Sequence, residues 1–107
     1  MWAGSVQLSA NQVAVTSTDV TLPEDGHSVT LTVDALGVTI ILDLVSKQHV
    51  ITNPDSVAGL EISRKLLFEG NDFAVRVTFR SPVDTECEVV WTAPEGTVLE
   101  NTTLTTE

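Results

Sequence analysis

Apolar and polar residues alternate along most of this chain, and this alternation limits what the chain can fold into. The clearest run extends from Phe73 to Arg80 and reads Phe-Ala-Val-Arg-Val-Thr-Phe-Arg. A β-strand points successive side chains to opposite faces, so such a run has one apolar face and one polar face. Similar runs recur along the chain, and helical spacing is almost absent. The pattern therefore predicts an all-β protein.

Turn signals separate these runs at short intervals. In Pro23-Glu24-Asp25-Gly26, proline fixes φ at the second turn position and Asp-Gly tolerates a positive φ. The predicted strands cover residues 6–8, 12–22 with a kink or bulge at 17–19, 28–33, 38–44, 49–52, 59–68 in two pieces, 73–80 and 86–92. This spacing favours a single β-sandwich or jelly roll of about eight short antiparallel strands.

The composition is that of a β protein with one apolar core. The chain contains 16 Val and 15 Thr, which are β-branched and favour strands, and hydrophobic residues make up 42% of it. A length of 107 residues corresponds to one domain. We expect a sandwich with a short N-terminal arm over residues 1–96 and a Thr- and Glu-rich C-terminal arm over 97–107. The predicted core residues are Val29, Leu31, Ile40, Leu42, Phe73, Val75, Val77, Val89 and Trp91.

The chain is strongly acidic, with a formal net charge of −10. A nucleic-acid-binding protein needs the opposite charge to neutralise phosphates, and an anionic membrane surface would repel this chain. The acidity either keeps the protein in solution or directs it to a basic protein surface, or to divalent-cation contacts in an assembly. We expect no secretory signal and no transmembrane helix, because the N-terminal residues are not basic and no apolar run approaches the length of a span.

The sequence has no recognisable catalytic motif. It lacks a Gly-rich phosphate loop, a nucleophile elbow and an HExxH motif. Cys87 is the only cysteine and lies on the inward face of its predicted strand, so we expect a buried thiol. His27 and His49 lack metal-ligand spacing, and Glu86 with Glu88 more often form a solvated strand face than a metal site. We therefore expect no enzyme activity, no cofactor and no metal.

Several residues are instead candidates for contacts with other proteins. Arg76 and Arg80 share one strand face and either pair with Glu86 and Glu88 of the next strand or bridge to another subunit. Trp2 lies in a polar N-terminal stretch and either anchors in a partner pocket or packs on its own sheet. The predicted interface residues are Trp2, Ile41, Arg76, Arg80, Leu99 and Leu104, the last two being apolar anchors of an arm that either meets a partner or folds back.

Short segments of the chain resemble small β-sandwich proteins on the virions of tailed phages, the head decoration and vertex proteins. The similar segments are Val13-Ala14-Val15-Thr16, Val20-Thr21-Leu22-Pro23, Ser28-Val29-Thr30-Leu31, Gly59-Leu60-Glu61-Ile62, the run from Phe68 to Val75, and Glu88-Val89-Val90-Trp91. The resemblance spans about residues 12–91. It departs at Asp34-Ala35-Leu36-Gly37, where the family has an Asn-x-Gly turn, and in the C-terminal residues, which have no counterpart.

The resemblance implies a non-enzymatic structural protein of the virion, a capsid decoration (cement) or vertex component that binds and stabilises the shell. It implies the major capsid protein or another virion protein as partner and a location on the virion after synthesis in the host cytoplasm. From Trp2, the apolar region Ile40–Leu42 and the C-terminal arm, we also expect association as a homo-oligomer or docking on a larger assembly, through the termini and one sheet face. No catalytic residues carry over from this family. The alternative is an Ig-like adhesion or carbohydrate-binding module, which usually displays aromatic residues on its loops.

Overall fold

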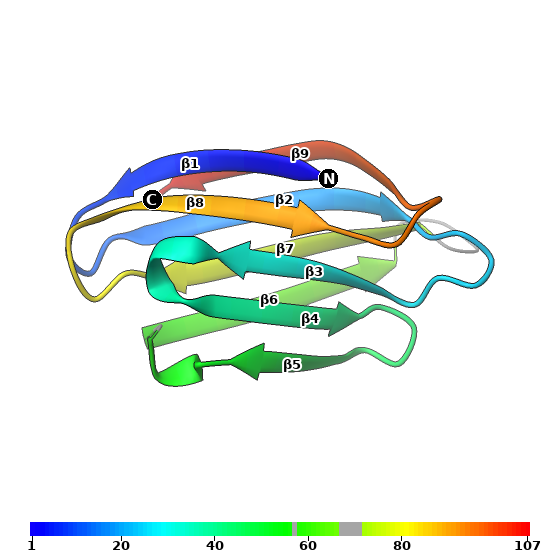
Figure 1. The fold of residues 1–107 in the computed structure, drawn as a ribbon, viewed down its shortest axis with the longest axis horizontal. Helices are drawn as coiled ribbons and strands as arrows, with labels where there is room; N and C mark the ends of the chain where they lie inside the picture. The colour runs from blue at the N-terminus through cyan, green and yellow to red at the C-terminus, as the bar shows by residue number, and fades with distance from the viewer. Residues whose placement is uncertain (57, 67–71) are drawn as a thin grey trace.

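The computed structural model of this chain describes residues 1–56, 58–66 and 72–107, and it is a sandwich of two antiparallel β-sheets (Figure 1). The predicted all-β fold is confirmed. The strands are β1 (Trp2–Leu8), β2 (Val13–Thr21), β3 (Ser28–Val33), β4 (Val38–Asp43), β5 (Gln48–Thr52), β6 (Ala58–Leu66), β7 (Asp72–Arg80), β8 (Thr85–Thr92) and β9 (Val98–Thr106). Two short 3-10 turns, η1 (Asp34–Leu36) and η2 (Pro54–Ser56), follow β3 and β5. None of the described residues belongs to a helix long and apolar enough to cross a membrane.

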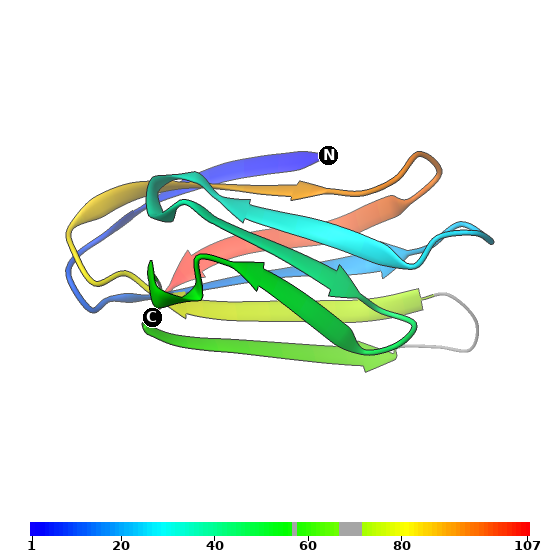
Figure 2. The same cartoon turned by 60° about the horizontal axis from the view of Figure 1, so that its bottom comes forward.

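The chain crosses between the two sheets repeatedly. The five-stranded sheet has the order β1-β8-β3-β4-β5, and the four-stranded sheet has the order β6-β7-β2-β9. Only β3, β4, β5 and the pair β6–β7 follow one another within a sheet. Every other connection passes from one sheet to the other (Figure 2). Strands far apart in sequence therefore become neighbours, as in the pairings of β2 with β7 and of β1 with β8.

The C-terminal residues form a strand of the sandwich. Residues Val98–Thr106, expected as an arm, pair along β2 and complete the four-stranded sheet. The kink or bulge expected at residues 17–19 coincides with a register shift between Ser17 and Asp19 in the pairing of β2 with β9, whereas β2 pairs with β7 without interruption from Val13 to Thr21. The irregularity lies in β9, where Ser17 faces Thr103 but Asp19 faces Glu100, so β9 holds one extra residue. Asn101 takes a φ of 53° there, a conformation that asparagine tolerates better than most residues.

The apolar faces of the two sheets meet in one core. Eight of the nine predicted core residues are at most 1% exposed; the exception is Phe73, which is half-buried at the end of β7. Phe79 of the same strand is also fully buried, as are Leu8, Val20, Val33 and Val38. The alternation therefore indicated the inward faces correctly, and it was least informative near strand ends.

A buried hydrogen-bonded chain joins the two sheets through this core. The indole Nε1–H of Trp91 in β8 donates to Oγ1 of Thr16 in β2 at 2.8 Å. The Thr16 hydroxyl in turn donates to the backbone carbonyl of Thr103 in β9, also at 2.8 Å. Trp91 and Thr16 are both fully buried. Because buried polar groups need partners, these two hydrogen bonds specify how β8, β2 and β9 lie against one another.

Candidate functional site

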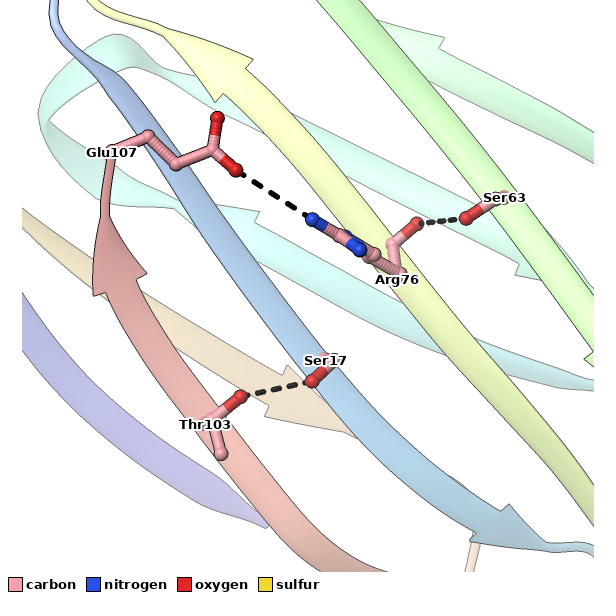
Figure 3. A network of polar contacts seen from close by, with 5 residues as sticks. All are labelled: Ser17, Ser63, Arg76, Thr103 and Glu107. Atoms are coloured by element: carbon pink, nitrogen blue, oxygen red, sulfur yellow. Dashed lines mark hydrogen bonds and ion pairs between the residues drawn. The ribbon is translucent and has the colours of Figure 1, made fainter.

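The outer face of the four-stranded sheet carries a polar network around Arg76 (Figure 3). The guanidinium of Arg76 in β7 lies 3.6 Å from a carboxylate oxygen of Glu107, and both side chains are more than half exposed. On the strands beside it, the hydroxyl of Ser63 donates to the Arg76 carbonyl at 3.5 Å, and the hydroxyls of Ser17 and Thr103 lie 2.9 Å apart. An ion pair this exposed contributes little to stability, because water and salt screen it.

A shallow groove of about 600 Å³ opens beside this network. Its lining residues are Glu61, Ile62, Ser63, Arg76, Thr78 and Glu107. Among the described residues, neither histidine lines it, and the Ser63 hydroxyl is directed to a backbone carbonyl. Its charged groups are Glu61, Arg76 and Glu107, two carboxylates beside one guanidinium.

The expected pairing of Arg76 and Arg80 with Glu86 and Glu88 is wrong. The chain changes sheets between β7 and β8, so the two glutamates lie on the opposite sheet of the sandwich. The strand neighbours of β7 are β6 and β2, which place Ser63 and Ser17 beside Arg76. Arg80 is exposed, and its guanidinium passes 3.7 Å from the position that a Cβ on Gly59 would occupy. The arginines therefore belong to the outer face of the four-stranded sheet.

The outer face of the five-stranded sheet has a different character. Strand register and alternation place nine uncharged residues side by side across it. We call this surface the neutral face; its residues are Ala3, Thr30, Thr32, Thr39, Ile41, Val50, Thr52, Val90 and Thr92. Ile41 and Val50 are directly opposite on β4 and β5, and they are 45% and 63% exposed. Glu88 and Asp43 lie next to the neutral face on β8 and β4, so acidic residues border it.

Strand β5 forms one edge of the neutral face. Its outer side has no partner strand in the part of the chain that the structure describes. The strand reads Gln-His-Val-Ile-Thr and contains neither a charged residue nor a proline, the two features that most often protect a sheet edge from pairing. The sequence predicted a strand here, but it gave no sign that the strand would lie at an edge.

The other apolar interface candidates turn toward their own core. Trp2, Leu99 and Leu104 are half-buried and pack against the central cluster. The Trp2 ring folds over Gly4, where an added Cβ would lie only 2.5 Å from Cη2 of the indole. Glycine at this position therefore lets the ring lie flat on β1. Of the two roles considered for Trp2, packing on its own sheet is the one that the structure contains.

The structure also locates the groups considered for metal binding and nucleophilic chemistry. Among the described residues, no three His, Cys, Asp or Glu side chains are grouped so as to hold a metal ion. Glu86 and Glu88 are exposed on the outer face of β8. Cys87 is fully buried, and burial raises the pKa of its thiol because the apolar interior disfavours the thiolate.

Comparison with known proteins adds no relative. No family model matches the chain, and neither a curated protein nor a solved structure is similar to it.

Proposed function

We propose that this protein is a structural component of a phage virion, a capsid decoration or vertex protein that docks on the shell and stabilises it. The observation that supports this proposal is the neutral face, an uncharged and partly apolar sheet surface on a chain of net charge −10. Such a surface loses little hydration energy when a partner covers it, whereas burying unpaired charges is costly.

The side chains of the neutral face are suited to a rigid contact. Eight of its nine residues are Thr, Val or Ile, whose branched side chains have few rotamers and lose little freedom on binding. The strands beneath are fixed by the core, so the surface is already in its binding conformation. The acidic residues at its border, Glu88 and Asp43, orient it against a partner with basic residues around an apolar centre.

A shell-binding assay tests this proposal. Shells of the phage whose genome encodes the chain are mixed with the purified protein and sedimented. Ile41→Lys should weaken co-sedimentation by about tenfold or more, because it places a charge at the centre of the contact. The matched control is Val83→Lys, since Val83 is 57% exposed but lies in the turn between β7 and β8. Absence of wild-type binding, or equal binding by Ile41→Lys, would contradict the proposal.

The alternative, an Ig-like adhesion or carbohydrate-binding module, has less support. Sugar-binding sandwiches stack their ligands on exposed aromatic rings. Of the aromatic residues, Trp91 and Phe79 are buried and Trp2 and Phe73 pack on the core, while Phe68 lies outside the described residues. Retention of a glycan on an array, together with no binding to shells, would favour this alternative over the decoration protein.

A further inference from the structure

We infer that strand β5 pairs with β5 of a second copy of this chain, so that two five-stranded sheets join edge to edge into one sheet of ten strands. This inference concerns how copies of the chain associate. It does not depend on the shell-binding proposal.

Strand β5 differs from the other sheet edges. Edge strands β1 and β9 lie next to each other along one side of the sandwich, where each partly covers the other (Figures 1 and 2). Edge strand β6 has a bulge, with Gly59 at a φ of 70°, and its sequence includes Glu61, Arg64 and Lys65. Bulges and charges are the usual means of preventing edge pairing, and β5 has neither.

An antiparallel pair of β5 strands is self-complementary. Centred on Val50, the pairing places Val50 opposite Val50, His49 opposite Ile51, and Gln48 opposite Thr52. Such a contact has two-fold symmetry and closes as a dimer. Because directly opposite residues share a face, the neutral faces of the two copies become continuous. The joined centre then reads Ile41, Val50, Val50, Ile41 across the four strands around the two-fold axis.

The residues that flank β5 carry opposite charges. Lys47 immediately precedes the strand, and Asp55 follows it in η2. In the antiparallel pairing, the turn that holds Lys47 of each copy lies at the same end of the contact as η2 of the other copy, which holds Asp55. The two-fold axis repeats this arrangement. The overall charge of −10 per chain opposes association, so dimerisation should strengthen as salt rises.

An edge of five residues makes a small contact, so we expect a weak, concentration-dependent dimer. The first experiment is site-specific cross-linking of Val50→Cys by a short bis-maleimide, with Val83→Cys as the control. The two valines are similarly exposed, at 63% and 57%, and the native Cys87 is buried. We expect at least about a tenfold excess of covalent dimer for Val50→Cys, because only that pair lies on the proposed axis. Equal cross-linking of the two variants would overturn the inference.

Sedimentation equilibrium provides an independent measurement without a reactive group. The wild type should dimerise at high protein concentration and moderate salt, Val50→Lys should be monomeric, and Val83→Lys should behave as the wild type. Thermal melts verify that both variants are folded. A wild type that stays monomeric throughout, or a Val50→Lys variant that dimerises as the wild type does, would overturn the inference. Shell docking is tested by co-sedimentation of Ile41→Lys, and dimerisation through β5 is tested by the Val50 variants. Either proposal can therefore fail while the other holds.

Discussion

Thr16 is the residue on which the contact between the two sheets depends most directly. Its buried hydroxyl accepts from Trp91 and donates to Thr103, so one side chain satisfies groups from two other strands. Valine has nearly the same shape as threonine but lacks the hydroxyl. Replacing Thr16 by valine would leave the Trp91 N–H and the Thr103 carbonyl without this partner, in surroundings that exclude water.

We therefore expect Thr16→Val to lower the free energy of unfolding by about 1–3 kcal/mol, the cost of leaving buried polar groups unpaired. Urea denaturation followed by tryptophan fluorescence measures it. Thr105→Val is the matched control, because Thr105 is exposed on the outer side of β9. Equal stability of the two variants would show that the buried hydrogen bonds of Thr16 contribute nothing to the free energy of unfolding.

Phe79 and Phe73 offer a second comparison between residues of one strand. Phe79 is 1% exposed, whereas Phe73 is half-buried at the opposite end of β7. Phe79→Ala should cost about 3–5 kcal/mol through lost burial and a cavity, and Phe73→Ala clearly less. Denaturant midpoints of the two variants decide this order. A larger loss for Phe73→Ala would mean that the strand end is packed more tightly than its exposure indicates.

At the scale of strands and turns, β9 carries more of the fold than its composition indicates. Its inward residues include Thr102, whose hydroxyl lies 2.8 Å from that of buried Thr18 in β2. A hydroxyl pair thus takes the place of an apolar contact at this point of β9. Thr102 can therefore face inward although it is polar, because the residue beside it on β2, Thr18, is polar too.

Deletion of residues 97–107 should accordingly unfold or severely destabilise the domain. It would expose an edge of β2 and remove the partners of the buried hydroxyls of Thr16 and Thr18. Circular dichroism and urea denaturation measure the effect. Deletion of Glu107 alone is the control, because this residue contributes an exposed ion pair and one backbone hydrogen bond. A truncated chain as stable as the full one would mean that β9 is a dispensable arm.

The turn before β5 depends on Asp43. The backbone N–H of Ser46 donates to this carboxylate at 2.8 Å and lowers the pKa of Asp43 below its usual value of 3.8, helped by the N–H of Val45 at 3.0 Å. Because the folded pKa is depressed, the stabilisation is present above the unfolded pKa of 3.8 and is lost as pH falls through the lower folded value.

We therefore expect Asp43→Ala to destabilise the β4–β5 hairpin at neutral pH, and the difference from the wild type to shrink as the carboxyl becomes protonated. Hydrogen exchange of the β5 amides at about pH 7 and about pH 3 measures this change. Asp43→Asn keeps an oxygen acceptor without the charge and serves as control. A difference that stays constant with pH would assign the effect to the oxygen acceptor alone.

The strands could be predicted from the sequence far better than their partners. Alternation depends on each strand alone, which is why the inward faces of β3, β4, β7 and β8 were correct. Pairing depends on where the chain changes sheets, and the turn at residues 81–84 does not reveal that β8 joins the opposite sheet. The prediction that Arg76 pairs with Glu86 and Glu88 was therefore wrong. The neutral face is assembled from five strands, and Ile41 was its only member among the predicted interface residues.

At the scale of the whole molecule, basic and acidic side chains are distributed unevenly between the two sheets. Four of the five basic residues belong to β6 and β7 of the four-stranded sheet, and the fifth, Lys47, precedes β5. The outer face of the five-stranded sheet combines the neutral face with a border of acidic residues. The two sides of the sandwich therefore present different surfaces, so a partner that docks on one side leaves the other free.

The placement of the first and last strands has a mechanical consequence. β1 and β9 run in the same direction on different sheets, so the chain starts near the middle of a body about 40 Å long and Glu107 lies toward one end, beyond the far end of β9 (Figure 1). Tension between Met1 and Glu107 pulls β1 along β8 and β9 along β2 in opposite directions. Each ladder is then sheared, and its hydrogen bonds bear the load together. Tension between Met1 and Thr97, at the starts of the two strands, would peel the ladders one bond at a time.

Single-molecule pulling should therefore show a much higher rupture force for attachment at Met1 and Glu107 than for attachment at Met1 and Thr97, since forced unfolding reports the barrier to leaving the native state. The arrangement of β1 and β9 therefore makes the sandwich resist tension applied between Met1 and Glu107 more than tension applied between Met1 and Thr97.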